Sequence, residues 1–236
     1  MKLFFIPYAG GSVNSYRVLR KYIDNEIDMV YLELAGRGAR IKEAFYKDIN
    51  EAAEDVFQQI KAELNKGESY AIFGHSMGAL ITYEAVQKLE MKGIHYPKHI
   101  FISARKAPHL KDPNRKVYML PDDEFIEELS KIGDLNMGFV KEPKLFKNFL
   151  PIIRSDYKMI EEYIFQEPIK KYKCNISIIY ALDDSEAPKE EVLEWKKYKG
   201  KDLECYEFNG GHFYLFSNRE ILPNILNNTL YQYMNN

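Results

Sequence analysis

The side chains most able to do chemistry begin with a serine that lies between two glycines. Ser76 lies in the run Gly74-His75-Ser76-Met77-Gly78, which has the G-x-S-x-G spacing of a nucleophile elbow. Such an elbow turns so sharply that its glycines have no room for side chains, and the serine hydroxyl stands clear of the chain. The first turn of a following helix points free N–H groups at that hydroxyl, where they can hold an anion. The run therefore predicts that Ser76 is a nucleophile.

A serine nucleophile needs a base, and His212 is the histidine that we predict for this role. It lies in the run Phe208-Asn209-Gly210-Gly211-His212-Phe213, directly after the last predicted strand. In chains with this kind of elbow the order is serine, then acid, then histidine. Of the five histidines, one lies inside the elbow and three precede any plausible acid, namely His75, His95, His99 and His109. A surface loop histidine without a role is the alternative for His212.

The acid that orients this histidine is expected just after a buried strand that ends at Ala181. The run Leu182-Asp183-Asp184-Ser185 offers two carboxylates at that place. We predict Asp184, because such acids commonly stand three residues beyond the small residue that closes the strand. Asp183 remains the alternative, and Glu186 is a more distant one. The aspartate that is not used would be a solvated turn residue.

Attack by a serine on a carbonyl creates an oxyanion, which two backbone N–H groups must stabilise. One should belong to Met77, the residue after the nucleophile. The other should come from the loop Pro7-Tyr8-Ala9-Gly10-Gly11-Ser12, whose paired glycines let the backbone approach a substrate closely. We predict Ala9 as this donor, with Tyr8 as the alternative. The loop lacks the G-x-G-x-x-G spacing and the phosphate signature of nucleotide sites.

The elements that must position these residues alternate between strand-like and helix-like runs. Near-continuous apolar strands separated by helices predict an α/β protein with a mostly parallel sheet covered on both faces. The predicted strands are Leu3–Ile6, Met29–Leu34, Tyr70–Phe73, His99–Ser103, Ile176–Ala181 and Leu203–Phe208. The predicted helices span about Ser15–Asp24, Ile49–Leu64, Met77–Lys92, Lys189–Tyr198 and Arg219–Tyr233.

One segment, from about Pro108 to Phe165, interrupts this alternation because it contains no convincing strand. A first helix is predicted after Pro121, where Asp122 can cap it and acidic residues suit the positive end of its dipole. A longer helix with an apolar stripe follows from about Pro143 to Tyr163. We predict one domain, residues 1–236, in which residues of about 108–165 form a helical lid over the nucleophile. An ordinary packing subdomain is the alternative.

The composition argues against several classes of protein. With 236 residues, 46% of them hydrophobic, the chain suits one domain with a full core. A net charge of -2 indicates neither a nucleic acid nor an anionic membrane as partner. The N-terminus does not suit a signal peptide and no run approaches the length of a spanning helix, so we expect a cytoplasmic protein. We interpret Cys174 and Cys205 as buried fillers without metal-ligand spacing.

An ordered set of motifs runs along nearly the whole chain. It consists of Phe5-Ile6-Pro7-Tyr8-Ala9-Gly10-Gly11, Leu32-Glu33-Leu34-Ala35-Gly36-Arg37-Gly38, Gly74-His75-Ser76-Met77-Gly78-Ala79, Ser103-Ala104-Arg105-Lys106-Ala107-Pro108-His109, Leu120-Pro121-Asp122-Asp123-Glu124-Phe125, Leu150-Pro151-Ile152-Ile153-Arg154-Ser155-Asp156, Glu190-Glu191-Val192-Leu193-Glu194-Trp195 and Gly210-Gly211-His212-Phe213. Together these motifs resemble the type II thioesterases of nonribosomal peptide and polyketide synthesis, which have the α/β-hydrolase fold. Two positions depart from the family pattern: Ala35 stands where proline is usual, and Ala181 where glycine is usual.

The resemblance implies a serine hydrolase with Ser76, Asp184 and His212 as its triad, which cleaves acyl thioesters from the phosphopantetheine arm of carrier proteins. In the family this reaction removes aberrant or stalled acyl groups, an editing role in antibiotic biosynthesis. The resemblance further implies a monomer that needs no metal and no cofactor beyond the phosphopantetheine on the substrate. Its transient partners would be acyl or peptidyl carrier domains. The alternatives are a carboxylester hydrolase with the same triad and a catalytically silent binding protein of this fold.

An acidic carrier domain would meet basic residues near the mouth of the predicted site. The sequence offers Arg37, Arg40, Arg105, Lys106, Lys111, Arg115 and Lys116. We interpret these residues as candidates for pairing with the acidic helix of the carrier or with the pantetheine phosphate. A solvated face without a partner is the alternative.

Overall fold

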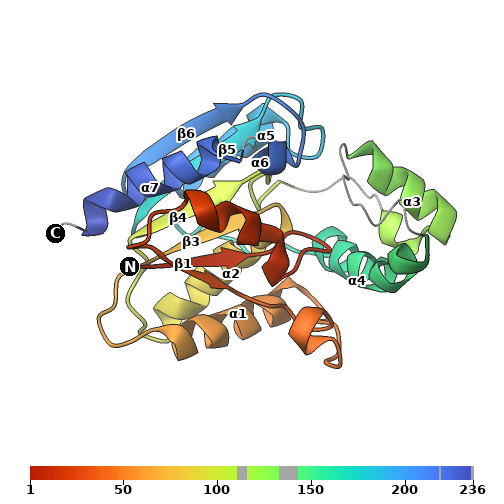
Figure 1. Cartoon of the computed structure of the whole chain (residues 1–236), viewed down its shortest axis with the longest axis horizontal. Coiled ribbons are helices and arrows are strands. Elements are labelled where there is room, and N and C mark those ends of the chain that lie inside the picture. Colours follow the sequence, from red (N-terminus) through yellow and green to blue (C-terminus); the bar gives the residue numbers. More distant parts are fainter. Residues whose placement is uncertain (111–115, 133–142, 218, 235–236) are drawn as a thin grey trace.

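The computed structural model describes residues 1–110, 116–132, 143–217 and 219–234, and of residues 143–148 the backbone alone. Six strands form one sheet in the order β2-β1-β3-β4-β5-β6 (Figure 1). Every pair of neighbouring strands is parallel, which confirms the predicted α/β sheet. The strands are β1 (Lys2–Ile6), β2 (Asp28–Tyr31), β3 (Tyr70–His75), β4 (His99–Ser103), β5 (Asn175–Ala181) and β6 (Leu203–Phe208).

The two outer strands of the sheet, β2 and β6, depart from the predictions. β2 ends at Tyr31 rather than at Leu34. In β6, Cys205 is exposed, so the prediction that it is a buried filler is wrong, whereas Cys174 is buried. Burial raises the pKa of the Cys174 thiol to about 12. An outer strand can turn one face to solvent, and the side chain of Cys205 lies on such a face.

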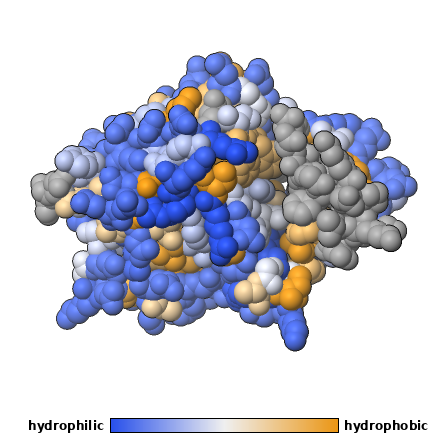
Figure 2. Space-filling model, viewed as in Figure 1, coloured by the Kyte–Doolittle hydropathy of each residue, from blue (hydrophilic) through white to orange (hydrophobic). Residues whose placement is uncertain are grey.

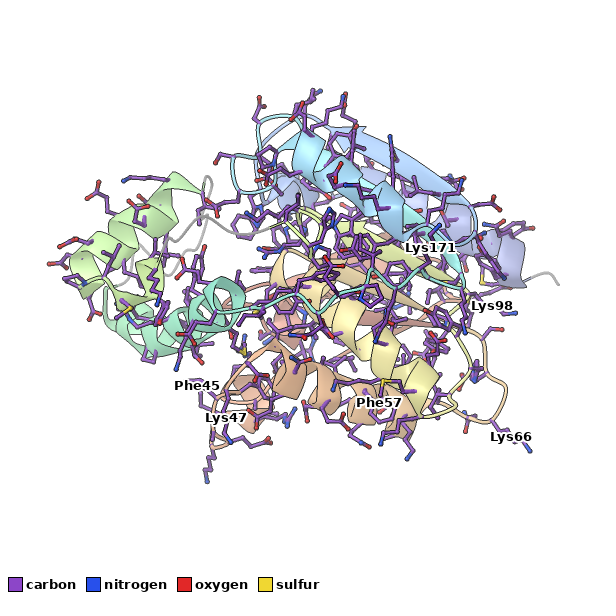
Figure 3. The ribbon with its side chains drawn as sticks, turned by 180° about the vertical axis from the view of Figure 1, so that it is seen from behind. Phe45, Lys47, Phe57, Lys66, Lys98 and Lys171 are labelled. Atoms are coloured by element: carbon purple, nitrogen blue, oxygen red, sulfur yellow. The ribbon has the colours of Figure 1, made fainter. Side chains whose placement is uncertain are left out.

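Helices cover both faces of the sheet, and each face buries its own apolar cluster. On one face α1 (Ile49–Glu63) and α2 (Met77–Met91) lie side by side (Figure 3), and α5 (Lys189–Leu193) and the 3₁₀ helix η4 (Glu194–Tyr198) complete that layer. The other face is covered by the 3₁₀ helix η1 (Val13–Tyr22), α6 (Tyr214–Ser217) and α7 (Ile221–Met234). A short 3₁₀ helix, η2 (Gly38–Arg40), follows β2.

Two segments predicted as α-helices contain 3₁₀ turns instead. η1 occupies most of the first predicted helix, and the segment 189–198 is divided between α5 and η4. In a 3₁₀ helix, side chains three residues apart lie over one another. Tyr16 and Leu19 have this spacing in η1, and both are buried against the sheet. The sequence reasoning missed α6, because a single helical turn is too short to show a periodic pattern.

The apolar side chains of the helices face the sheet, while polar side chains face solvent. In α1, Asp48 caps the helix by accepting from the N–H of Glu51 at 2.9 Å, and Val56, Phe57 and Ile60 are buried. The surface drawn in Figure 2 is hydrophilic over most of its area. Among the helices that the structure describes, none is long and apolar enough to cross a membrane.

A separate group of helices lies at one end of the molecule (Figure 1). It contains the 3₁₀ helix η3 (Val117–Met119), α3 (Asp122–Lys131) and α4 (Pro143–Glu161), which share a small apolar cluster. Phe213, next to His212, packs against this cluster. The prediction that Asp122 caps α3 is wrong, because Asp122 is already the first helical residue and its carboxylate accepts from Arg154 at 2.7 Å. The lid role of this group remains a prediction.

The buried side chain of His99, at the start of β4, predicts a loss of stability in acid. It is 2% exposed, and its Nε2 lies 2.8 Å from the hydroxyl oxygen of Ser177. Burial lowers the pKa of His99 from the ordinary 6.5 to about 4. Between these values the unfolded chain takes up a proton and the folded protein does not. Folding stability therefore falls as the pH drops from 6.5 toward 4, by about 2 to 3 kcal/mol at pH ~4.5.

Urea unfolding at pH ~7 and ~4.5 measures this contribution. We compare the wild type with His99→Gln and, as an exposed control, His95→Gln. Between pH ~7 and pH ~4.5 the free energy of unfolding should fall in all three proteins. We expect this fall to be about 2 to 3 kcal/mol smaller in His99→Gln than in the wild type and His95→Gln. An equal fall in all three proteins would show that His99 has an ordinary pKa.

Candidate active site

A strained turn between β3 and α2 holds Ser76. This residue has φ 54° and ψ -119°, a conformation that residues with side chains seldom adopt. A Cβ on Gly74 would lie 2.4 Å from the carbonyl oxygen of Gly78, and a Cβ on Gly78 would lie 2.3 Å from that of Ile6. Both glycines are thus required by packing. α2 begins at Met77, so the free N–H groups of its first turn follow the serine directly.

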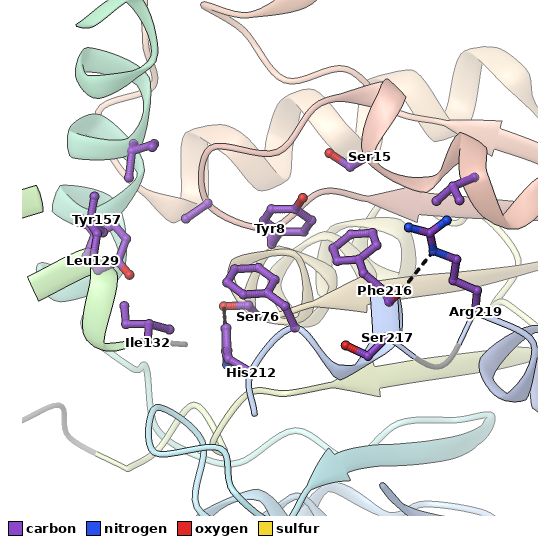
Figure 4. A pocket seen from close by; sticks show the side chains of 14 residues that line it. Tyr8, Ser15, Ser76, Leu129, Ile132, Tyr157, His212, Phe216, Ser217 and Arg219 are labelled. Atoms are coloured by element: carbon purple, nitrogen blue, oxygen red, sulfur yellow. Dashed lines mark hydrogen bonds between the residues drawn. The ribbon is translucent and has the colours of Figure 1, made fainter. Parts of the chain in front are cut away.

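A chain of hydrogen bonds joins Ser76, His212 and Asp184, which lie in loops at the carboxyl ends of β3, β6 and β5. The Oγ of Ser76 lies 2.8 Å from Nε2 of His212 (Figure 4), and Nδ1 of His212 lies 2.8 Å from Oδ2 of Asp184. An ionised carboxylate only accepts, so Nδ1 carries the proton and Nε2 is left to accept from the serine hydroxyl. The three residues are 9%, 6% and 3% exposed in this order. In such an arrangement the imidazole can take the serine proton.

The loop after β5 brings Asp184, and not Asp183, to the imidazole. The second carboxylate oxygen of Asp184, Oδ1, accepts from the N–H of Glu186 at 3.0 Å and from that of Ala187 at 3.1 Å. These two bonds fix the plane of the carboxylate and leave Oδ2 for the imidazole. The side chain of Asp183 is exposed, and its backbone N–H donates to the carbonyl oxygen of Gly210 at 3.0 Å.

His75 lies beside the imidazole of His212, a contact that the sequence reasoning missed although His75 is next to Ser76 in the chain. The two ring centroids are 5.3 Å apart. Nδ1 of His75 lies 2.8 Å from Oγ of Ser103, which in turn lies 2.5 Å from the hydroxyl oxygen of Tyr214. Burial, and then the charge of His212, lower the pKa of His75 well below its ordinary value. His75 is therefore neutral at neutral pH and adds no second charge beside an imidazolium.

The loop after β1 forms a tight turn that carries the second predicted oxyanion donor. The N–H of Gly11 donates to the carbonyl oxygen of Tyr8 at 2.8 Å, and Gly10 has φ 75°. A positive φ at the third residue is that of a type II turn. Ala9 and Tyr8 both line the cavity at Ser76. Within the described residues, the N–H groups of Ala9 and Met77 have no hydrogen-bond partner, so both are available to a ligand.

A cavity of about 440 Å³ opens at Ser76 and His212 and extends in two directions (Figure 4). Toward α3 and α4 its walls are largely apolar and include Leu129, Ile132, Ile153 and Tyr157. Toward η1 and α6 its walls combine the apolar side chains of Val18 and Phe216 with the hydroxyls of Ser15 and Ser217 and the guanidinium of Arg219. The side at α3 and α4 can thus hold an apolar group, and the mixed side at η1 and α6 can contact both the carbon atoms and the polar groups of a second chain. Across the described ranges, no three His, Cys, Asp or Glu side chains are arranged to hold a metal ion.

Arg37 is buried against Asp156 of α4, so the prediction that it faces a carrier domain is wrong. Arg37 is 3% exposed and Asp156 is 0% exposed. The two terminal guanidinium nitrogens each lie 2.7 Å from a carboxylate oxygen. Burial alone would lower the pKa of Arg37, but the charge and hydrogen bonds of Asp156 outweigh burial and raise it. Arg37 turns inward because each charge compensates the other for its loss of water.

The other basic residues proposed for docking differ in exposure. Arg40 is held by ion pairs to two carboxylates, and Lys106 is 7% exposed. Arg105 is half-buried, and Lys116 is exposed. A docking role for these four remains a prediction, and two further candidates lie outside the described residues, namely Lys111 and Arg115.

Comparisons with known proteins show similarity along nearly the whole chain and not in the elbow alone. The family model described as "Thioesterase domain" matches residues 1–230. Linear gramicidin dehydrogenase LgrE of Brevibacillus parabrevis is 32% identical over 241 residues, which cover 98% of this chain and 88% of that protein. The probable anguibactin biosynthesis thioesterase AngT of Vibrio anguillarum is 35% identical over 213 residues, which cover 89% of this chain and 83% of that protein.

The similarity also holds for the three-dimensional fold. The crystal structure of ClbQ, from the colibactin NRPS/PKS pathway, matches with a TM-score of 0.92 and 30% sequence identity. The match covers 98% of this chain and 97% of that chain. Coverage of this extent must include the sheet, its helical layers and the separate group of helices at one end.

Proposed function

This chain belongs to the thioesterase domain family, and on that premise we propose that it hydrolyses acyl thioesters on the phosphopantetheine arm of carrier proteins. It acts as a type II thioesterase that removes aberrant or stalled acyl groups in nonribosomal peptide or polyketide biosynthesis. The observation that carries the proposal is the chain of hydrogen bonds from Ser76 through His212 to Asp184. This chain lies at a cavity that extends from Ser76 toward α3 and α4 on one side and toward η1 and α6 on the other. The reaction requires no cofactor besides the phosphopantetheine that arrives with the substrate.

In the first half-reaction Ser76 attacks the carbonyl carbon of the thioester. Nε2 of His212, 2.8 Å from the serine oxygen, takes the hydroxyl proton as the new C–O bond forms. The N–H groups of Met77 and Ala9 hold the oxyanion, a contribution of about 3 to 4 kcal/mol for one donor. The C–S bond then breaks, and the pantetheine sulfur leaves and receives the proton from the imidazolium. The acyl group remains on the serine as an ester.

In the second half-reaction water takes the place of the thiol. Nε2 of His212 removes a proton from the water as its oxygen attacks the ester carbonyl, and the same N–H groups hold the second oxyanion. The proton passes to Oγ of Ser76 as the C–O bond to the serine breaks, and the carboxylic acid leaves. In both steps Asp184 keeps the other proton on Nδ1 and stabilises the imidazolium.

The two directions of the cavity suit the two halves of a carrier thioester. The acyl chain lies toward α3 and α4, where apolar walls lower its exposure to water. The pantetheine arm, with its amides and terminal phosphate, extends toward the hydroxyls and the guanidinium of Arg219.

A dehydrogenase activity, which the name of LgrE would suggest, finds no support in this site. A dinucleotide site needs a G-x-G-x-x-G loop whose N–H groups meet a pyrophosphate. The loop after β1 has two adjacent glycines instead, and the N–H of Gly10 already donates to the carboxylate of Asp156 at 2.7 Å. This N–H is therefore not free to meet a pyrophosphate.

The proposal is tested with two substrates that share one acyl group, a carrier domain loaded through phosphopantetheine and a simple oxygen ester. Acetyl, longer acyl and aminoacyl groups are compared in turn, and Ser76→Ala gives the background rate. We expect kcat/KM for the carrier thioester to be at least ~100-fold higher, because the carrier arm adds binding and thiolate is the better leaving group. Equal values would favour a carboxylester hydrolase, and no turnover of either substrate would favour a binding protein.

A further inference from the structure

A single buried carboxylate, that of Asp156, links α4 to the loop that carries Ala9. Its Oδ2 accepts from the N–H of Gly10 at 2.7 Å and from Arg37 at 2.7 Å, and its Oδ1 accepts from Arg37 at 2.7 Å. Arg37 also donates to the carbonyl oxygen of Gly11 at 3.2 Å. We propose that Asp156 is a positioning residue that sets the geometry of the oxyanion hole. The inference rests on the proposed function, since it takes Ala9 as an oxyanion donor.

The turn from Tyr8 to Gly11 has two possible forms, which differ by a flip of its central peptide. Type I has a negative φ at the third residue, while type II has a positive φ there and points the central N–H to the opposite side. Gly10 is that third residue and has φ 75°. Its N–H is the group that a flip would move away from Asp156. The carboxylate therefore selects one form of the turn.

The same turn directs the N–H of Ala9. This N–H shares a peptide plane with the carbonyl of Tyr8, and in a trans peptide the two bonds point in opposite directions. The N–H of Gly11 holds that carbonyl inside the turn at 2.8 Å, so the N–H of Ala9 points out of it. Types I and II share this bond, so a flip of the central peptide alone leaves the N–H of Ala9 in place. Asp156 acts on Ala9 by holding the whole turn, through the N–H of Gly10 and, by way of Arg37, the carbonyl oxygen of Gly11. If these bonds are lost and the turn opens, the peptide between Tyr8 and Ala9 can rotate, and an oxyanion meets the donor in many orientations instead of one.

Asp156 and Arg37 form a buried ion pair. The guanidinium offsets the cost of taking the carboxylate out of water. The ionised acceptor makes the bond from Gly10 roughly twice as strong as a neutral one. Ile153, one turn earlier on α4, closes the space above the loop, since a Cβ on Gly10 would lie 2.7 Å from its Cγ1. The oxyanion hole is therefore complete only when α4 is docked on this loop.

Two double variants separate this positioning role from stability. Arg37→Gln/Asp156→Asn removes both charges but keeps an amide oxygen that can accept from the N–H of Gly10. Arg37→Leu/Asp156→Leu removes the acceptor, and apolar replacement of a buried ion pair commonly preserves stability. We expect the leucine pair to lower kcat by about 100-fold or more and the amide pair by less than about tenfold. Thermal unfolding of both variants verifies that each is folded.

A third variant, Asp156→Glu, keeps the ion pair but moves the carboxylate by one methylene group away from its place beside Gly10. It serves as the test if the leucine pair does not fold. We expect its kcat to fall by at least about tenfold, with KM within about threefold of the wild-type value. A wild-type kcat in folded Asp156→Glu or in the folded leucine pair would overturn the proposal.

A pair of inhibitors distinguishes positioning from substrate binding. A trifluoromethyl ketone analogue of acyl-pantetheine forms a bond to Oγ of Ser76 and places an oxyanion in the hole, whereas the matching thioether binds without one. In the leucine pair we expect the ketone to bind about 100-fold more weakly and the thioether to change by less than about twofold. Equal weakening of both inhibitors would show a role in binding or folding and would overturn the proposal.

Hydrolysis of an activated aryl ester tests the role of Asp156 independently of the proposed carrier substrate. This reaction needs the nucleophile and the oxyanion hole but no carrier protein. If the wild type cleaves the aryl ester and no carrier thioester, the proposed function fails, and the variants at Asp156 are still compared on the aryl ester. If the variants equal the wild type on that ester, the positioning role fails whatever the natural substrate is.

Discussion

Ser76→Ala is expected to lower kcat for carrier thioesters by at least about 10⁴-fold while the protein remains folded. The change removes the oxygen that accepts the acyl group, so the remaining N–H groups and the imidazole have no nucleophile to assist. The hydroxyl contributes one hydrogen bond to His212, and its loss costs only about 1 kcal/mol of stability. Acid release from an acyl carrier domain, followed by mass spectrometry, measures the rate, and thermal unfolding measures the fold.

The matched controls are His212→Ala and the double variant Ser76→Ala/His212→Ala. A nucleophile and its base act as one unit, so the double variant should be within about tenfold of the slower single variant. Multiplication of the two single losses would mean that the residues act separately. Retention of more than about 1% of the wild-type kcat by folded Ser76→Ala would contradict its role as nucleophile.

Asp184→Asn is expected to lower kcat by about 10³ to 10⁴-fold, since the same change in a serine protease triad costs about 10⁴. The amide cannot satisfy its neighbours, because both carboxylate oxygens of Asp184 accept: Oδ1 from the N–H groups of Glu186 and Ala187, and Oδ2 from His212. An amide that presents its oxygen to the two backbone donors turns its NH₂ to Nδ1. The imidazole then carries its proton on Nε2 and can no longer accept from the serine.

Asp183→Asn is the control for this prediction, because it makes the same change one residue earlier. Its side chain is exposed, and its backbone N–H bond to Gly210 does not depend on the side chain. We expect kcat within about twofold of the wild type. Steady-state kinetics of both variants on one carrier thioester measures the difference. A larger loss in Asp183→Asn than in Asp184→Asn would assign the acid to residue 183.

The elbow and the sheet could be predicted because short runs of residues encode them. The contacts that require Gly74 and Gly78 lie within the elbow or with the neighbouring strand β1. Near-continuous apolar runs identify buried parallel strands wherever they occur in the chain. Chain order then left His212 as the base, and the structure places its Nε2 2.8 Å from the serine oxygen.

The choice between neighbouring carboxylates depended on the folded chain. Asp183 and Asp184 have the same chemistry and nearly the same position in the sequence, so their spacing to His212 does not separate them. The backbone N–H groups of Glu186 and Ala187 hold Asp184, and these groups reach it only because the loop after β5 turns there. The exposure of Cys205 could not be predicted for a similar reason, because only the order of the strands in the folded sheet makes β6 an outer strand.

The pairing of Arg37 with Asp156 was the feature that the sequence alone could least predict. The two residues are separated by 119 positions, and each one alone resembles an ordinary surface charge. A lone charge stays in water because its burial is costly, so a local pattern predicts exposure for both. Packing of α4 on the loops after β1 and β2 brings the charges together, and each then offsets the desolvation of the other. Local patterns thus encode the strands, the elbow and the chain order of the predicted triad, while burial of a distant pair depends on both partners at once.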